Sequence, residues 1–357
     1  MKEPFVSIIL VNFNGLRYTI PCIESLNKME YSQYELIVVD NGSKDGSLEA
    51  LRKRHDIILI EAGSNVGFAK ANNFGAARSS KKAEYIVLLN NDTIVTPPWL
   101  RELIAPFKND KTLGAVMAKI HNKYEKNEYR FEGYGTMTAL GYFSYAGLRN
   151  EKITDKDLPE LFYASGCTLA YPKKLVSKPF DDDYFIYAED TYCSWLLRLQ
   201  GYHIKLVPKS IVYHEGSAVV KDFRQMSAFF TYLGERNRIM NMMIFYSWWS
   251  QIRLLPLGLI AAALNNLYDP KNFLNRLRAY GWIIAHPLRI GKKRKYVQRF
   301  RKVSDKHIFK YMSYKLFEEE HVSSGLFKKT LQALNAFAYG YCKWVGIKTK
   351  EMYSFKW

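Results

Sequence analysis

Cysteine is scarce in this chain of 357 residues, and the few cysteines are widely spaced. They are far apart and form no CxxC pair, which speaks against a zinc site and against a disulfide framework. A reduced, cytosolic environment fits this usage best. No uninterrupted apolar run reaches about 18 residues, so the sequence does not indicate a plain transmembrane helix. The four cysteines are Cys22, Cys167, Cys193 and Cys342.

Two common nucleotide-binding signatures are missing as well. The sequence has no GxxxxGK[ST] motif, and no GxGxxG follows the first predicted strand, so an ATPase and a dinucleotide-binding protein lose their main support. The residues Met1–Ser7 lead almost at once into a predicted strand, and we therefore expect no signal peptide. Apolar residues make up 48% of the chain and aromatic residues 15%, which is too much for general disorder.

Acidic residues are scarce only in the last part of the chain. Residues 1–220 carry 27 Lys/Arg and 26 Asp/Glu, a balance of +1, whereas residues 221–357 carry 25 and 8, a balance of +17. We therefore expect two parts of different character, residues 1–220 and residues 221–357. A strongly basic part faces nucleic acid or an anionic membrane, and its other residues must decide between them.

Segments typical of strands and of helices alternate through the first hundred residues. Alternation at this spacing predicts βαβ units and a parallel sheet, so the expected fold class is α/β. Ligands bind at the carboxyl ends of the strands in such sheets, which makes a nucleotide site along that edge the default hypothesis. The predicted strands are Val6–Phe13, Tyr34–Asp40, Ile57–Ile60 and Tyr85–Leu89, and the predicted helices are Tyr18–Lys28, Ser47–Arg54 and Gly67–Ser79.

An aspartate lies at the end of the second predicted strand, and another follows the fourth. Each has two possible roles. Asp92 follows the fourth strand, where a carboxylate can hold a divalent metal beside a phosphate, although an Asx-rich turn explains the same residues. Asp40 ends the second strand. Its carboxylate can accept the imide N–H of uracil or thymine, or it can form an Asx turn that leads into Asn41 and Gly42. The residues alone leave both alternatives open in each case.

Seven motifs, in order and at similar spacing, resemble those of the family 2 glycosyltransferases, and most closely those of the rhamnosyltransferase-like branch. The resemblance covers residues 4–240. It implies a GT-A fold, which is a Rossmann-like, mostly parallel sheet flanked by helices, followed here by a basic, apolar helical C-terminal region. The motifs are Val6–Gly15, Ile37–Ser47, Asn65–Gly75, Leu88–Thr93, Ser165–Leu169, Phe180–Asp190 and Val207–His214.

The resemblance implies roles for the residues that match these motifs. Asp40 matches the acid that reads the pyrimidine base, and Asp92 matches the last acid of the DXD-like element, which binds Mn²⁺ or Mg²⁺ with the nucleotide diphosphate. His214 matches the metal-proximal histidine. Asn90 and Asn91 precede Asp92, and because an amide ligates without charge, the metal affinity is expected to be modest. The other matches at the nucleotide are Asn12, Asn14, Asn65, Gly67, Lys70 and Asn91.

Asp190 matches the catalytic base of the family. An acceptor hydroxyl is a poor nucleophile until a positioned carboxylate takes its proton, and one such base suffices for a single displacement with inversion. The adjacent Glu189 either shares this role or makes a structural hydrogen bond. From its surroundings alone, Asp190 also fits an exposed acid ahead of an amphipathic helix at Tyr192–Leu199.

The residues beyond 220 combine apolar, aromatic and basic side chains. Met226–Leu264 is dense in apolar residues, Pro256 is expected to kink its helix, and Lys292–Lys302 is strongly basic. Such a mixture is what an interfacial helix on an anionic leaflet requires. Two alternatives are a helical subdomain with solvated lysines and a nucleic-acid site, which no accompanying motif supports. The aromatic segment Gly133–Gly147 either stacks on an acceptor or packs as core.

These observations predict an inverting glycosyltransferase of the hexosyltransferase type, bound peripherally to the cytoplasmic face of the cell membrane. It would move a sugar from a UDP- or dTDP-linked donor to a hydroxyl of a lipid-linked saccharide acceptor, with an anionic membrane surface and no nucleic acid among its partners. One alternative is a nucleotidyltransferase, for which Arg17 is the only nearby activating residue. The other is a non-catalytic membrane-bound scaffold with a vestigial transferase domain.

Overall fold

The structure, a computed structural model, describes residues 3–123, 129–131, 134–146, 158–215, 228–316 and 325–353. The chain divides into two compact units. The first comprises Met1–Tyr134, Gly147–Leu197 and Tyr202–Gln225, and the second comprises Gly135–Ala146, Arg198–Gly201 and Met226–Trp357. The second unit thus takes in two short segments from ahead of residue 220.

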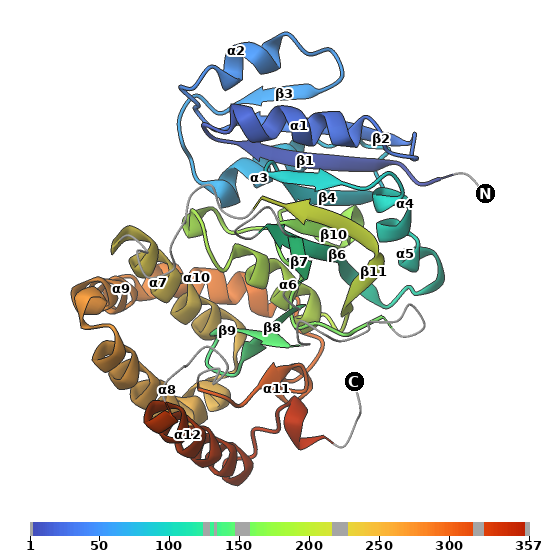
Figure 1. The fold of residues 1–357 in the computed structure, drawn as a ribbon. Helices are drawn as coiled ribbons and strands as arrows, with labels where there is room; N and C mark the ends of the chain where they lie inside the picture. The colour runs from blue at the N-terminus through green and yellow to red at the C-terminus, as the bar shows by residue number, and fades with distance from the viewer. Residues whose placement is uncertain are drawn as a thin grey trace. The chain divides into compact units, whose positions relative to one another are not determined.

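The first unit is built on a nine-stranded sheet whose main path runs β3-β2-β1-β4-β10-β6-β11-β5, with β7 paired to β6 (Figure 1). The strands from β3 to β4 are parallel, β10 runs antiparallel between β4 and β6, and β6 pairs in parallel with β11. The predicted α/β class with a mostly parallel sheet is therefore confirmed. The strands are β1 Val6–Asn12, β2 Tyr34–Asp40, β3 Ile58–Glu61, β4 Tyr85–Asn90, β5 Thr93–Val95, β6 Leu113–Lys123, β7 Tyr129–Phe131, β10 Thr168–Pro172 and β11 His203–His214.

Different helices cover the two faces of the central strands, because successive side chains of a strand point to opposite faces. Ile8 and Leu10 of β1 share one buried core with Cys22 of α1 and Trp99 of α4. Ile9 points to the other face, where α3 packs on β1. The helices of this unit are α1 Leu16–Leu26, α2 Ser47–Arg52, α3 Phe68–Arg78, α4 Trp99–Ile104, α5 Pro106–Asn109 and α6 Glu189–Leu199, which ends within the second unit.

The strands and helices predicted in the first hundred residues all form, with ends that differ by at most two residues. The helix predicted from Tyr192 instead begins at Glu189, so Glu189 and Asp190 lie inside its first turn. Acidic side chains are favourable there because they face the positive end of the helix dipole. The eleven-residue strand β6 was not predicted, since its residues run from small and apolar to polar without a clear alternation.

The second unit is mostly helical and includes a three-stranded sheet in the order β12-β8-β9. The apolar stretch after residue 227 forms α7 and α8, and residues 226 and 227 lie outside the described part. The basic stretch forms α9 and α10, which pack against α7. The elements are β8 Tyr134–Thr138, β9 Phe143–Ala146, α7 Ala228–Phe245, α8 Trp248–Tyr268, α9 Phe273–Ala285, α10 Pro287–Gln298, α11 Asp305–Phe309, β12 Met312–Ser313 and α12 Gly325–Trp344.

A buried ion pair lies within the second unit. Arg238 Nη2 is 2.6 Å from Glu235 Oε1, and its guanidinium lies 4.0 Å from the ring centre of Tyr142. Burial raises the pKa of the Tyr142 phenol to about 12, as expected for a packed ring. Tyr142 of the aromatic segment is therefore half-buried and packed against this ion pair. Gly133 and Gly147, the ends of that segment, lie outside the described residues.

No helix in the described ranges combines the length and apolarity that are needed to cross a membrane. The 21-residue α8 contains Pro256 and continues as helix on both sides of it.

The close approach of α3 to β1 gives a test of the fold. A Cβ added at Gly75 would lie 2.4 Å from Ile9 Cγ2, so Gly75→Ala should lower the free energy of unfolding by about 1–3 kcal/mol through overpacking. Gly291 lies on an exposed part of α10 with open space around its Cα. The matched change Gly291→Ala should raise stability by about 0.5–1 kcal/mol, because alanine favours helix. Urea unfolding of both variants measures this, and changes of equal sign would contradict the packing described.

Candidate active site

Amide and hydroxyl side chains join the ends of β1, β2 and β4 at one edge of the sheet. Asn12, fully buried at the end of β1, donates through Nδ2 to Asp40 Oδ2 at 2.8 Å and to Ser43 Oγ at 2.9 Å. Its Oδ1 accepts from the hydroxyl of Thr19 at 2.7 Å. Asn91 in turn donates to Thr19 Oγ1 at 2.7 Å. One continuous network therefore fixes three strand ends against α1.

Asp40 is only 1% exposed, and both of its carboxylate oxygens accept hydrogen bonds within the protein. Besides the bond from Asn12, Oδ1 accepts the backbone N–H groups of Gly42 at 3.2 Å and Ser43 at 3.0 Å. The Asx turn considered from the sequence is thus present. An ionised carboxylate has about four acceptor positions, so one remains for the imide of a base. The base-reading role of Asp40 stays a prediction.

The loop after β2 is tied to the loop that leads into α3. Asn41 donates to Asn65 Oδ1 at 3.0 Å, and the same oxygen accepts the N–H of Gly67 at 3.0 Å. Gly42 has φ +80° and lies against Ser64, where a Cβ would come within 2.6 Å of the Ser64 Cα. Only glycine fits there. Asn65 and Gly67 therefore hold the start of α3 beside the end of β2.

Asn14 and Lys70 are the remaining predicted nucleotide contacts. Asn14 joins the network because its N–H donates to Ser43 Oγ at 2.9 Å and its Oδ1 accepts the N–H of Lys44 at 2.7 Å. Its φ of +50° makes it part of a tight turn. Lys70 lies one turn into α3, with its ammonium 5.7 Å from the ring centre of Phe74. The structure thus builds Asn14 into the network, whereas Lys70 lies in the first turn of α3 with Phe74 and Asp182 as its neighbours.

Asp92 and His214 meet where the β4–β5 turn approaches the end of β11. Asp92 Oδ1 lies 3.2 Å from His214 Nε2, and both side chains are largely buried. His214 Nδ1 is 2.8 Å from Asn122 Oδ1, an oxygen that can only accept. When Nδ1 donates to that oxygen, a neutral His214 points the lone pair of Nε2 at a carboxylate oxygen of Asp92. Two acceptors this close are stable only with a proton or a metal cation to satisfy them.

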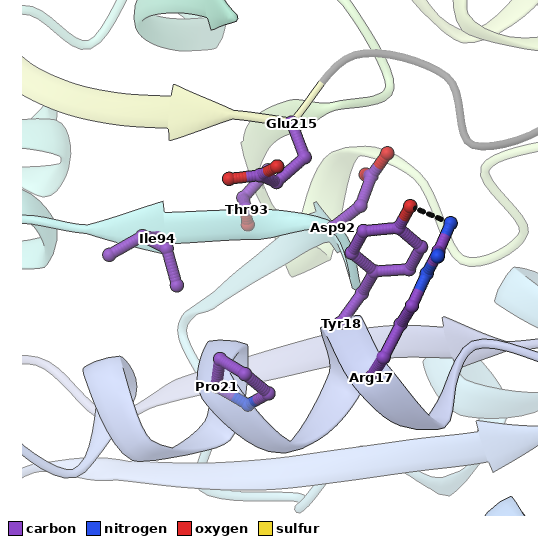
Figure 2. A pocket seen from close by; sticks show the side chains of 7 residues that line it. All are labelled: Arg17, Tyr18, Pro21, Asp92, Thr93, Ile94 and Glu215. Carbon is purple, nitrogen blue, oxygen red and sulfur yellow. Dashed lines mark hydrogen bonds between the residues drawn. The ribbon is translucent and has the colours of Figure 1, made fainter. Parts of the chain in front are cut away.

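A cavity of about 340 Å³ opens beside Asp92 (Figure 2). Figure 2 shows two residues of α1, Arg17 and Tyr18, hydrogen-bonded to each other on one side, with Asp92 and Glu215 opposite. Glu215 is paired with Lys123 at 2.7 Å. The cavity thus presents carboxylates and a guanidinium, a combination suited to a cation and a phosphate. Its lining residues are Arg17, Tyr18, Pro21, Asp92, Thr93, Ile94 and Glu215.

Asp190 is linked to the end of β4 through the segment ahead of β10. Its Oδ2 accepts the N–H of Gly166 at 3.3 Å. The next residue, Cys167, accepts the N–H of Asn90 through its carbonyl at 3.0 Å. Asn90 is the last residue of β4 and stands two positions before Asp92. One backbone connection therefore supports both the predicted base and the predicted metal-binding acid.

The two acids at the start of α6 hold protons more tightly than free carboxyl groups. Burial raises the pKa of Asp190 to about 6, against the opposing effect of N–H donors from Gly166 and Thr191. Burial also raises the pKa of Glu189 well above its usual value, and the negative charge of Asp190 adds to the rise. Glu189 Oε2 has no hydrogen-bond partner among the described residues. A carboxylate whose pKa lies near the working pH is well suited to accept a proton.

The backbone that leads into α6 is strained. Phe185, Tyr187 and Ala188 have φ values of +60°, +72° and +63°, and each such non-glycine residue costs about 1–3 kcal/mol. Contacts with α3 hold this conformation. The Phe185 carbonyl accepts the N–H of Ala69 at 3.0 Å, and Gly67 lies so close that a Cβ would be 2.5 Å from the Phe185 ring. Strain of this kind is typical of functional sites and here sets the position of the two acids.

Asn73 of α3 anchors the same segment. Its Nδ2 donates to the Phe180 carbonyl and to Asp182 Oδ1, both at 2.8 Å, and its Oδ1 accepts the Phe180 N–H at 3.1 Å. The amide is largely buried and satisfies both backbone groups of Phe180. Asn73 therefore anchors the segment that leads to the predicted base Asp190.

Several residues of the site were not expected from the sequence. Asn73 lies in the motif Asn65–Gly75, whose other matched residues were predicted to contact the nucleotide. Thr19 and Asn122 gave no signal, because nothing in the order of residues shows that a helix hydroxyl meets β4 or that β6 lies beside His214. Glu215 follows His214 directly and could have been found from that position.

Comparison with protein families gives a match over much of the first unit. Residues 7–180 match the family described as "Glycosyl transferase family 2". The matched range contains the amide network and Asp92, and it ends ahead of α6.

Curated proteins with similar sequences come from staphylococci. The chain is 26% identical over 213 residues to a poly-beta-1,6-N-acetyl-D-glucosamine synthase of Staphylococcus epidermidis, a range that covers 58% of this chain and 48% of that protein. It is 27% identical over 208 residues to the protein of the same name from Staphylococcus aureus strain COL, covering 57% and 48%. The chain spans about half the length of these relatives.

Solved structures share the fold. GalNAc-T7 with UDP, GalNAc and Mn²⁺ aligns with a TM-score of 0.54 at 15% identity, over 79% of this chain and 58% of that chain. S. aureus TarS 1-349 in complex with UDP aligns with a TM-score of 0.50 at 15% identity, over 94% and 89%. At this identity the likeness concerns the fold, and it agrees with the GT-A fold that the sequence resemblance implied.

The raised pKa of Asp190 predicts a pH-dependent stability. Because its folded pKa of about 6 exceeds the unfolded value, its contribution is present below pH 4 and is lost as the pH rises through 6. Asp190→Asn has no carboxyl group to ionise, so the variant does not lose this stability as the pH rises. The variant should therefore match the wild type near pH 4 and be more stable by roughly 1–3 kcal/mol at pH 7.5, as measured by thermal unfolding.

Asp56 supplies a control of opposite sign. Its hydrogen bond from Arg54 lowers its pKa to about 2, so its contribution is present above pH 4 and is lost as the pH falls. Asp56→Asn should therefore be less stable than the wild type at pH 7.5, with a difference that shrinks toward pH 3. If Asp190→Asn followed the same trend as Asp56→Asn, the environment described for Asp190 would be wrong.

Proposed function

We propose that the chain is a family 2 glycosyltransferase, an inverting enzyme that moves a sugar from a nucleotide diphosphate sugar to a hydroxyl of a saccharide, and the match of residues 7–180 to that family supports this. The observation that carries this proposal is the position of Asp190. A carboxylate whose pKa is about 6 is held by one backbone connection to the end of β4, next to the paired Asp92 and His214. In this proposal the base and the diphosphate site lie in the same unit.

The reaction follows from these positions. Asp190 accepts the proton of the acceptor hydroxyl while the hydroxyl oxygen forms a bond to the anomeric carbon of the donor sugar. The bond from that carbon to the diphosphate oxygen breaks, and the nucleoside diphosphate leaves with both electrons. One displacement inverts the anomeric configuration. The rise in the pKa of Asp190 comes from burial, which also strengthens its interaction with the positive charge that develops on the sugar.

A divalent cation, Mn²⁺ or Mg²⁺, fits between the groups at the end of β4. Asp92 offers a carboxylate oxygen and His214 an imidazole nitrogen whose partner at Nδ1 leaves Nε2 as an acceptor. No group of three or more His, Cys, Asp or Glu side chains suited to a metal occurs among the described residues. Two protein ligands would therefore hold the ion together with the diphosphate. When bound, the ion neutralises charge on the departing diphosphate.

The donor base and sugar belong to the proposal. UDP- or dTDP-sugars fit the last open acceptor position of Asp40, which would take the imide N–H of a pyrimidine. GalNAc-T7 and TarS were solved with UDP, which supports a uridine nucleotide. The predicted membership of the rhamnosyltransferase-like branch remains a prediction.

We further propose a lipid-linked saccharide acceptor and a peripheral position on the cytoplasmic face of the cell membrane. The basic, apolar second unit supports this, because residues 221–357 carry 25 Lys/Arg against 8 Asp/Glu. In this arrangement the first unit binds the donor and carries out transfer, and the second unit meets the membrane. A scaffold with a vestigial transferase domain would not require the strained backbone ahead of α6 or the raised pKa of Asp190.

The role of Asp190 is tested by its amide variant. Asp190→Asn should reduce kcat/KM for transfer by about 10²–10⁴-fold while leaving donor affinity unchanged, since the amide keeps the shape but cannot take a proton. The wild-type kcat/KM should rise with pH and level off above about 6. Asp56→Asn, an exposed substitution away from the site, should keep full activity. Full transfer activity of Asp190→Asn would show that Asp190 is not the base.

Donor and metal are tested together by thermal stabilisation. A panel of UDP-, dTDP- and GDP-sugars, with and without Mn²⁺, should raise the Tm most for a pyrimidine donor with Mn²⁺, by the equivalent of about 2.7 kcal/mol at a hundredfold excess over Kd. Asp92→Asn should lose most of the added effect of Mn²⁺ and keep part of the effect of the nucleotide. An undiminished Mn²⁺ effect in that variant would place the metal elsewhere.

A further inference from the structure

Helix α8 is apolar along most of its surface, but the second unit covers only one side of it. Leu254, Leu257 and Ala261 are buried on the inner side. The outer side carries large apolar residues at intervals of four, three and four, which places them in one row along the helix. These four are between 59% and 64% exposed: Trp248, Ile252, Leu255 and Leu259. A helix that is apolar all round normally lies inside a protein or in contact with lipid.

Helix α12 repeats the arrangement. Its inner side buries Ala338 and Cys342, whereas Phe337, Tyr341 and Trp344 follow one another along the outer side. The Tyr341 hydroxyl donates to the carbonyl oxygen of Arg253 at 2.9 Å, so the row on α12 lies next to α8. Figure 1 shows the two helices side by side. We call the seven outward residues the α8/α12 face: Trp248, Ile252, Leu255, Leu259, Phe337, Tyr341 and Trp344.

The charges that border this face have one sign. Neither α8 nor α12 contains an acidic residue, and their charged side chains are Arg253, Lys328, Lys329 and Lys343. Residues 270–304 add eleven Lys/Arg and no Asp/Glu. The guanidinium of Arg294 lies 4.4 Å from the ring centre of Trp248, which brings the basic helix α10 to the edge of the face. The face is therefore apolar at its centre and basic at its border.

We propose that the α8/α12 face is the surface by which the protein lies on an anionic phospholipid leaflet. Apolar side chains along two adjacent helices match the boundary between headgroups and acyl chains, where tryptophan and tyrosine are favoured. The basic border matches the phosphate of the headgroups. A second copy of the chain fits less well, because pairing two such faces brings basic borders together. A nucleic acid would contact the basic border through its phosphates but would not bury the apolar side chains of the α8/α12 face.

This assignment rests on the proposed peripheral location and adds the face that makes the contact. It does not depend on the transfer reaction. Binding to vesicles needs neither donor nor acceptor, so failure of the membrane contact and failure of the catalytic proposal are seen in separate measurements.

Flotation of the full chain with vesicles tests the assignment. Vesicles of equal parts phosphatidylglycerol and phosphatidylcholine should carry the wild type upward, and pure phosphatidylcholine should carry at least tenfold less. Leu259→Glu on α8 and Phe337→Glu on α12 should each lower the partition coefficient at least tenfold. Gln332→Glu is the matched control, since it adds the same charge to an exposed position of α12 outside the apolar row, and it should stay within twofold of the wild type.

Leu259→Ser removes apolar surface without adding charge, and it keeps the test valid if a glutamate variant unfolds. It should lower the partition coefficient at least threefold, with a Tm close to that of the wild type. The proposal is overturned if the wild type does not float with anionic vesicles, or if Leu259→Glu and Phe337→Glu float as well as Gln332→Glu. Sedimentation without lipid gives a third check: a stable dimer that Leu259→Glu separates would assign the face to a second copy.

Discussion

The parallel strands β1, β2 and β4 end at one edge of the sheet, and polar side chains buried there must satisfy one another because water does not reach them. Asn12 meets this constraint with one amide, which donates to Asp40 and Ser43 and accepts from Thr19. A buried donor or acceptor left unpaired costs about 1–3 kcal/mol, so the network holds the loops in one arrangement. The donor site follows from this arrangement, since the loops that would surround a nucleotide are fixed before it binds.

A second constraint acts on the acids of α6. Burial raises their pKa values, and an acid that is costly to ionise adds nothing to stability at neutral pH. Three residues with positive φ ahead of the helix add strain to this cost. The anchoring amide of Asn73 and the contact of Gly67 with Phe185 offset part of it by fixing the segment on α3. Such costly features gathered at one place are typical of functional sites.

The sequence predicted the first half of the sheet well because local patterns determine it. The apolar runs of β1, β2 and β4 and the polar residues after them are read directly from the order of residues, and motif spacing pointed to Asp92, His214 and Asp190. Contacts between distant segments were beyond reach. The pairing of His214 with Asn122 depends on β6 lying beside β11, and β6 carries no clear alternation. The start of α6 was misplaced because two acids at a helix start look the same inside or ahead of it.

Asn90 and Asn91 are neutral, although they precede Asp92 in the element that resembles a DXD motif. The amide network explains why. The side chain of Asn91 gives its amide protons to Thr19 and Asn12, and the carbonyl of Asn90 accepts the hydroxyl of Thr93. Asn91 therefore acts as a structural link between β4 and α1, while Asp92 alone of the three faces the cavity. A carboxylate in place of Asn91 would be an acceptor opposite the acceptor oxygen of Asn12, close to Asp40, and would lose both bonds. The neutral residues are thus what a buried amide network requires, and the proposed metal site rests on Asp92 and His214.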